Sequence, residues 1–134
     1  MKYILMMHAP RAGWETAGIG TWPPKDIKAH IGFMMRFNQE LKEAGELVGA
    51  EGLAGPEQAR IVRASKNDGA PEVTDGPYPE AKEFLAGYWI VDCESTERAY
   101  EIAARASAAP GKAGVPMNMP IEVRQVMSAP PVDL

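Results

Sequence analysis

Two histidines are the side chains of this chain best suited to acid–base chemistry near neutral pH, and His30 is the stronger candidate. On a helical projection of residues 26–44, His30 falls on an apolar stripe with Ile27, Met34 and Phe37. Burial disfavours the charged imidazolium and would keep the ring neutral, as a general base must be. The alternative is a structural histidine whose ring nitrogen bonds a backbone carbonyl.

Asp75 and Arg124 would supply the acid and the anion-binding group of such a site. Asp75 could orient His30 or act as an acid–base group at the mouth of a cleft. Alternatively, its carboxylate accepts hydrogen bonds from backbone N–H groups of an Asp-Gly-Pro turn. Glu122 and Arg124 share one face of the last predicted strand, where Arg124 could bind an anion through paired hydrogen bonds. The alternative there is a solvated edge strand or an ion pair with another subunit.

Three further side chains are weaker candidates for substrate binding. His8 ends the first predicted strand, where a sheet of this kind opens into its pocket, although a surface position would explain it equally well. The phenols of Tyr78 and Tyr88 could donate to a substrate oxygen, but core or interface packing is the commoner use of tyrosine. We therefore predict His30 and Asp75 as catalytic, and Arg124, Glu122 and these three side chains as substrate-binding.

The elements that must position these residues alternate between strands and helices. The sequence predicts strands at 2–8, 47–53, 58–65, 71–74, 86–93 and 121–127, and helices at 26–44 and from Ser95 onward. Gly45 would end the first helix, and Asn67-Asp68-Gly69 would turn a hairpin. The loop between Pro10 and Pro24 carries two tryptophans and would be either an aromatic lid or a segment that wraps a partner.

This order predicts an α+β fold, a ferredoxin-like unit with an added hairpin. Two helices can cover only one face of its sheet, whereas strands 2–8 and 86–93 are apolar on both faces. A second copy of the chain is the natural cover for the other face, so we predict a homodimer.

Composition limits the function classes. The chain has 134 residues, 46% of them hydrophobic, and a net charge of −4, which predicts one domain (1–128) and a tail (129–134). No basic patch predicts contact with nucleic acid, and no apolar run is long enough for a signal peptide or a membrane span, so a cytoplasmic protein is expected. Cys93 lies between two acids and would be a poor nucleophile. No motif predicts a metal or a cofactor.

Residues 73–82, Val-Thr-Asp-Gly-Pro-Tyr-Pro-Glu-Ala-Lys, resemble the Asp-Gly-Pro-Phe signature of the DGPF subgroup of the YCII-related family, with Tyr78 at the Phe position. The run Lys28-Ala29-His30-Ile31 resembles the surroundings of the histidine proposed as catalytic in YCII proteins, and Ile121–Arg124 resembles the end of DGPF proteins. The resemblance implies a dimeric α+β barrel and an acidic partner late in the helix of His30, for which Glu43 is the loose match.

Two hypotheses of function follow. The resemblance implies folds that host isomerases, lyases and dehydrochlorinases without cofactors, which would act on a small organic acid in an apolar cleft. It equally implies a non-catalytic ligand-binding or regulatory dimer, since family members often accompany sigma-factor-like proteins; a structural dimer is a third option. Convergence of His30, Asp75 and Arg124 on one apolar pocket would favour the enzyme.

Overall fold

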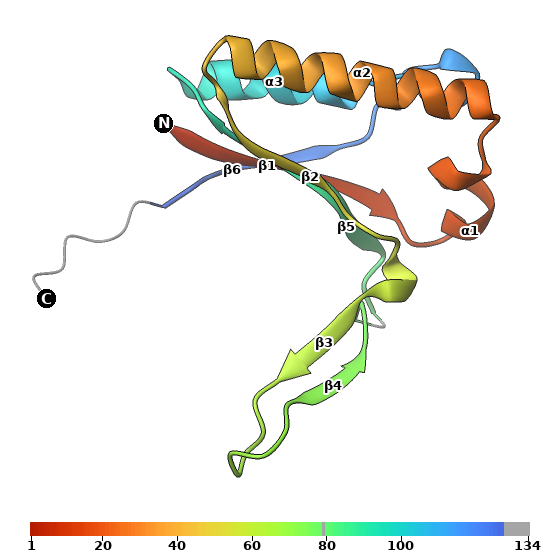
Figure 1. Ribbon diagram of the computed structural model, residues 1–134, viewed down its shortest axis with the longest axis vertical. Coiled ribbons are helices and arrows are strands. Elements are labelled where there is room, and N and C mark those ends of the chain that lie inside the picture. The colour runs from red at the N-terminus through yellow and green to blue at the C-terminus, as the bar shows by residue number, and fades with distance from the viewer. Residues whose placement is uncertain (79, 128–134) are drawn as a thin grey trace, which may run out of the picture.

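The fold consists of one antiparallel sheet, two long helices and a hairpin that projects from them (Figure 1). The computed structural model describes residues 1–78 and 80–127, so the predicted tail lies outside the described residues. The strands are β1 (Lys2–Pro10), β2 (Leu47–Gly52), β3 (Arg60–Arg63), β4 (Glu72–Asp75), β5 (Glu83–Asp92) and β6 (Ile121–Gln125). The helices are α1 (Trp14–Ala17), α2 (Pro24–Glu43) and α3 (Thr96–Ser107), with short 3₁₀ turns η1 (Ile19–Thr21), η2 (Pro56–Gln58) and η3 (Lys112–Gly114).

The main sheet has the strand order β2-β5-β1-β6, and every neighbouring pair is antiparallel. Each of the two long helices connects a central strand to an edge strand, which is the split β-α-β arrangement of a ferredoxin-like unit. The second sheet is the hairpin β3–β4, inserted between β2 and β5. The predicted fold class is therefore confirmed. The predicted strands at 58–65 and 121–127 are shorter than expected, and the predicted loop between Pro10 and Pro24 contains α1 and η1.

Local sequence signals fix both long helices. Pro24 occupies the first turn of α2, where a missing N–H carries no penalty, and Gly45 follows the helix with φ 73°, a conformation that suits glycine. Ser95 caps α3 as predicted, because its Oγ accepts a hydrogen bond from the backbone N–H of Arg98 at 3.1 Å.

The core lies between the sheet and the two helices. Leu5 of β1 and Val91 of β5 meet Phe37 and Leu41 of α2 and Ile102 of α3, and all five side chains are almost fully buried. Such burial stabilises the fold by roughly 1.5–3 kcal/mol for each large apolar side chain.

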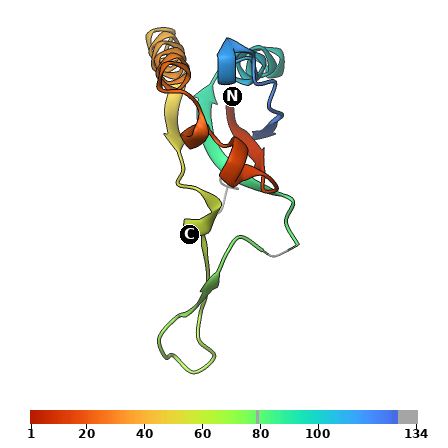
Figure 2. The same cartoon turned by 90° about the vertical axis from the view of Figure 1, so that its right-hand side faces the viewer.

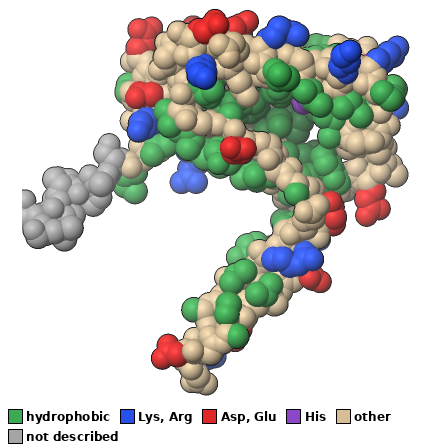
Figure 3. All heavy atoms as spheres, in the orientation of Figure 1, with side chains coloured by type: hydrophobic (Ala, Val, Ile, Leu, Met, Phe, Trp, Pro, Cys, Tyr) green, Lys and Arg blue, Asp and Glu red, His purple; other side chains and the backbone are tan. Residues whose placement is uncertain are grey.

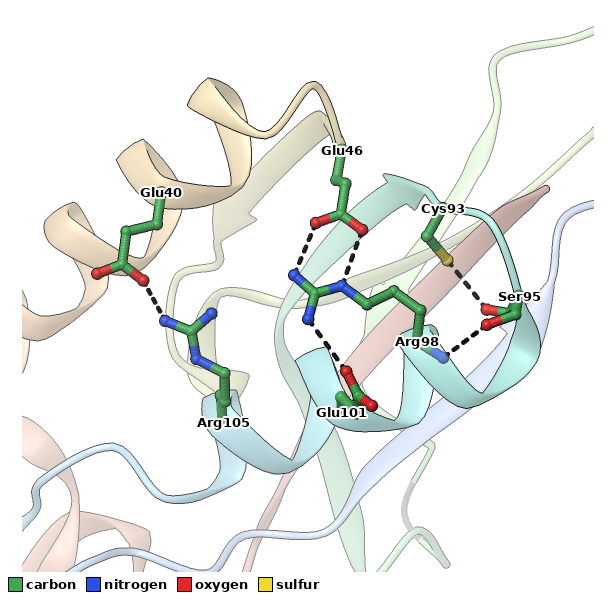
Figure 4. A network of polar contacts seen from close by, with 7 residues as sticks. All are labelled: Glu40, Glu46, Cys93, Ser95, Arg98, Glu101 and Arg105. Atoms are coloured by element: carbon green, nitrogen blue, oxygen red, sulfur yellow. Dashed lines mark hydrogen bonds and ion pairs between the residues drawn. The ribbon is translucent and has the colours of Figure 1, made fainter.

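Polar contacts tie the helical layer together (Figure 4). The guanidinium of Arg98 on α3 donates two hydrogen bonds, of 2.8 and 2.9 Å, to the carboxylate of Glu46, which directly precedes β2. Hydrogen bonding to Arg98 is the main cause that lowers the pKa of Glu46 below its usual value. Arg105 of α3 bonds Glu40 of α2 as well, and these contacts link the two helices and the start of β2.

The two faces of the sheet are covered differently. Figure 2 shows both long helices on the same side of the sheet. On the other face, Ile4 and Met6 of β1 lie across from Ile90 and Tyr88 of β5, and all four side chains are partly exposed. We call this second surface the open face. No helix of residues 1–78 and 80–127 lies on it.

The hairpin β3–β4 extends away from the sheet as an arm (Figures 1 and 2). Val62 and Val73 are direct cross-strand partners in it, and both are more than half exposed. A two-stranded hairpin without further packing is marginally stable in water. The arm therefore has much less local support than the main sheet.

Candidate functional site

A cavity of about 450 Å³ opens beside α2, at the end of the sheet where β1 and β5 meet the loop that contains α1. Hydrophobic side chains gather in a hollow below α2 on the face shown in Figure 3. The wall consists almost wholly of apolar residues and glycine: Met7, Ala9, Pro10, Ala12, Gly13, Trp14, Ala17, Gly18, Ile19, Trp22, His30, Gly52, Leu53, Phe84, Ala86, Met117 and Met119.

A bulge lies at this end of the sheet. Met7 pairs with Gly87, but His8 pairs with Leu85, so Ala86 of β5 has no partner on β1. A bulge bends its strand and redirects side chains, and Ala86 contributes to the cavity wall. The small side chain of Ala86 leaves room there, whereas Gly87 allows the close approach of β2, since a Cβ at Gly87 would lie 2.9 Å from the carbonyl oxygen of Glu51.

The loop between β1 and α2 supplies the aromatic part of the wall. The ring of Trp14 meets that of Phe84 edge to face at a centroid distance of 4.9 Å. Trp22 is buried and meets the ring of His30 in the same geometry at 5.6 Å, and its Nε1 donates to the carbonyl of Ala17. Both tryptophans therefore contact their own chain at the cavity. Whether this loop also reaches a partner stays a prediction.

His30 is 8% exposed, and its contacts determine which ring nitrogen carries the proton. Its Nδ1 lies 3.0 Å from the carbonyl oxygen of Pro110. A carbonyl only accepts, so Nδ1 is the donor and the neutral ring has its lone pair on Nε2. Among the described residues no fully buried side-chain nitrogen or oxygen lacks a partner. Nε2 has no hydrogen bond to any residue that the structure describes, so it reaches accessible space, and His30 lines the cavity.

Asp26 is a second buried polar side chain on α2, and sequence reasoning missed it. Its Oδ2 accepts the backbone N–H of Ala113 at 3.0 Å, so Asp26 and His30 both hold the loop between α3 and β6. That loop carries Met117 and Met119 into the cavity wall. The spacing of four residues, which places Asp26 on the same helix face as His30, was the available signal.

A smaller cavity of about 210 Å³ adjoins the first one, because both are lined by Met7, His30 and Gly52. Tyr88 and Asn38 also line it. Asn38 accepts a hydrogen bond of 2.8 Å from the indole of Trp89 through Oδ1, which leaves its amide N–H groups as possible donors. Of the predicted site residues, His30 and Tyr88 both line this cavity. The side chain of Tyr88 nevertheless lies on the open face, because the neighbouring Trp89 points to the helices, so the structure does not bring its phenol to His30.

Asp75 lies elsewhere, at the end of β4 in the arm. Its side chain is 97% exposed, and its carboxylate is 3.6 Å from Nε of Arg60. Asp75 lines neither cavity beside His30, and it makes no side-chain hydrogen bond to the backbone of its turn within the described part of the chain. Within one chain the structure therefore does not bring Asp75 to His30, because the arm points away from α2.

Glu122, Arg124 and His8 belong to the open face. Nε2 of His8 lies 3.0 Å from Oε1 of Glu122. Arg124 lies across from Ile4 on the neighbouring strand, and it has no side-chain partner among the residues the structure describes. The thickness of the sheet separates this group from the core side, so Arg124 cannot hold an anion beside His30 in the same chain.

The remaining candidates have contacts of their own. Tyr78 is 53% exposed, and its backbone carbonyl accepts from Arg11. Glu43 accepts from Gln39 on the exposed side of α2, more than three turns beyond His30. Cys93 is buried and donates to the carbonyl of Ser95, and burial raises the pKa of its thiol. That direction agrees with the expectation of a poor nucleophile.

Comparison with known proteins gives a consistent family assignment. None of the helices in residues 1–78 and 80–127 is long and apolar enough to cross a membrane. An uncharacterised protein of Rhizobium meliloti is 36% identical over 98 residues, which are 73% of this chain and 77% of that protein. The family model described as the YCII-related domain matches residues 1–123. The chain therefore belongs to the YCII-related family.

Proposed function

We propose that this protein is a cofactor-free acid–base enzyme that binds a small molecule in the His30 cavity. The observation that carries the proposal is the hydrogen bond between Nδ1 of His30 and the carbonyl of Pro110. It assigns the basic lone pair to Nε2, the nitrogen that faces accessible space. A volume of about 450 Å³ lies within the range of roughly 300–1,000 Å³ that is typical of small-molecule pockets.

The surroundings of His30 favour proton transfer at carbon. The base would take a proton from a substrate held against an apolar wall, and a neutral imidazole needs no preceding deprotonation. In the large cavity, His30 is the one acid–base side chain that the described residues contribute. A single base that removes a proton and returns it to a neighbouring carbon performs an isomerisation. Elimination fits equally when the substrate carries a leaving group.

The test of this proposal is hydrogen exchange at carbon in D₂O. Small ketones and lactones with an acidic C–H, beginning with 2-tetralone, are incubated with the protein, and the loss of that proton signal is followed by NMR. We expect faster exchange with the wild type, and a rate close to the uncatalysed one with His30→Gln. His8→Gln is the matched control, since it removes the histidine of the open face and should leave the exchange rate unchanged.

A non-catalytic ligand-binding or regulatory module is the alternative, and the same cavity favours it. In that case the wild type binds such compounds, as calorimetry would show, but does not accelerate exchange. Equal exchange rates for wild type, His30→Gln and His8→Gln would contradict catalysis by His30.

For the assembly we propose a homodimer that covers the open face. The support is the row of partly exposed apolar side chains on two central strands, Ile4, Met6, Tyr88 and Ile90. Obligate interfaces of this kind bury about 2,000 Å² or more in total. His8, Glu122 and Arg124 would then lie at the interface, where the His8–Glu122 contact would satisfy two polar groups.

Light scattering tests the assembly. The wild type should have the mass of a dimer at micromolar concentration. Met6→Asp places a charge on the open face and should shift the mass to that of a monomer, or prevent folding. Met35→Asp is the control, since Met35 is 68% exposed on α2 and should tolerate the charge. A dimeric Met6→Asp variant would contradict this interface.

A further inference from the structure

We infer that the ligand of the His30 cavity is a neutral, planar aromatic molecule with a phenol-type hydroxyl that donates to Nε2 of His30. The inference rests on the proposed binding site and adds the chemical class of the ligand. It also departs from the small organic acid that the sequence suggests.

The charge of the wall excludes a carboxylate. None of the described residues that line the large cavity is Lys, Arg, Asp or Glu. Burying an ionised carboxylate without a partner is costly, so an acid would bind only in its less abundant neutral form. Arg124 lies on the open face. Arg11 does not line this cavity; it lines a neighbouring groove that shares Gly13 and Trp14 with it, and it donates to the carbonyl of Tyr78.

The polarity of the wall specifies a donor. Apart from the tryptophan indoles, which only donate, His30 is the one described lining residue with a polar side chain. Nδ1 is occupied by Pro110, and Nε2 of the neutral ring can only accept. A ligand must therefore bring its own O–H or N–H. A phenol fits best, because it is a neutral group whose hydroxyl is acidic enough to donate strongly.

The shape of the wall favours a flat ring system. The wall presents the aromatic rings of Trp14, Trp22 and Phe84. Trp14 and Phe84 meet edge to face, as do Trp22 and His30. Met7, Met117 and Met119 add thioethers, which contact aromatic rings favourably and adapt to their outline. A volume of about 450 Å³ leaves room for two fused rings.

The experiment compares three probes of one size by calorimetry: 2-naphthol, 2-methoxynaphthalene and 2-naphthoate. 2-Naphthol should bind the wild type at least about tenfold more tightly than the methyl ether, a factor that corresponds to about 1.4 kcal/mol. 2-Naphthoate should bind most weakly. His30→Gln should reduce the preference for the hydroxyl to less than about threefold while the methyl ether still binds, whereas His8→Gln should preserve the preference.

A second pair of variants locates the binding. A Cβ at Gly52 would have no atom within 4 Å, and Gly52 lines both cavities, so Gly52→Leu should fill space there and weaken 2-naphthol binding at least tenfold. Gly20→Leu is the control, because Gly20 is equally unobstructed and exposed but lies on η1, outside the cavity wall.

The outcomes separate the inference from the proposed function. If 2-naphthoate binds most tightly and Gly52→Leu weakens that binding, the ligand class is overturned but the location of the site is kept. Binding of no probe, or binding unchanged in Gly52→Leu, overturns both. If the protein prefers the hydroxyl in a way that depends on His30 but catalyses no hydrogen exchange in D₂O, the ligand class is supported and catalysis is contradicted.

Discussion

The two faces of the main sheet carry apolar side chains from the same strands but have different environments. Leu5 and Val91, which point to the helices, are 0% exposed, whereas their chain neighbours Ile4 and Ile90 remain partly exposed on the open face. Adjacent residues of a strand alternate between faces. The difference therefore comes from what lies against each face and teaches that strand composition alone does not determine burial.

The two histidines repeat this comparison in polar chemistry. His30 lies on the covered side, where Pro110 binds one ring nitrogen and the other faces an apolar cavity. His8 lies on the open face beside the carboxylate of Glu122. One residue type thus lies beside an apolar cavity in one place and beside a carboxylate in the other.

The largest expected effect comes from truncating the covered face. Leu5→Ala should lower the free energy of unfolding by about 2–5 kcal/mol, because it leaves a cavity among fully buried side chains. Met6→Ala, one residue along on the open face, should cost less than half as much when measured by urea denaturation at concentrations where the protein is monomeric. Equal losses would show that the open face is as well packed within one chain as the covered face.

A smaller effect is expected at the ion pair that links α3 to β2. Glu46→Gln should lower the free energy of unfolding by about 1.5–3 kcal/mol at pH 7, the range for hydrogen bonds to charged groups. Arg98 lowers the pKa of Glu46 in the folded state, so this stabilisation is present above the unfolded pKa of about 4.3 and disappears as pH falls through the folded value.

Denaturation curves measured from pH 7 down to pH 3 check the direction of this pH dependence. The difference in free energy of unfolding between wild type and Glu46→Gln should narrow as the solution becomes more acidic. Glu101→Gln is the control, since Glu101 bonds the same arginine but is mostly exposed, and its effect should stay under about 0.5 kcal/mol. A gap that widens toward acid would refute the assignment of Glu46 as the ionised partner.

The smallest effect is expected in the arm. The ion pair between Asp75 and Arg60 is exposed, so Asp75→Ala should change the free energy of unfolding by less than about 0.5 kcal/mol. This value replaces the larger loss that an Asp-Gly-Pro turn suggests, because the Asp75 carboxylate binds no backbone N–H of that turn in the described chain. The measurement is chemical denaturation of the wild type and Asp75→Ala. A loss of about 1 kcal/mol would contradict this prediction and indicate that the Asp75 carboxylate does bond the turn.

Much of the fold follows from local signals. Short runs of apolar residues on both faces marked the central strands β1 and β5, while Gly45 and Ser95 marked where α2 ends and α3 begins. The bulge at Ala86 and the short helix α1 were missed, because both depend on packing between distant segments. The DGPF subgroup stays a prediction, whereas the family itself is established over residues 1–123.

The sequence by itself determined that His30 lies on the buried stripe of a helix, because helical periodicity is a local property. It also determined that the sheet has two apolar faces. Only the tertiary structure decided that His30 meets Pro110, eighty residues away, and that Asp75 and Arg124 lie apart from it. The reason is physical: contacts between distant segments depend on strand order, on which face each strand presents and on the direction of the arm, and none of these is fixed by the spacing of residues along the chain.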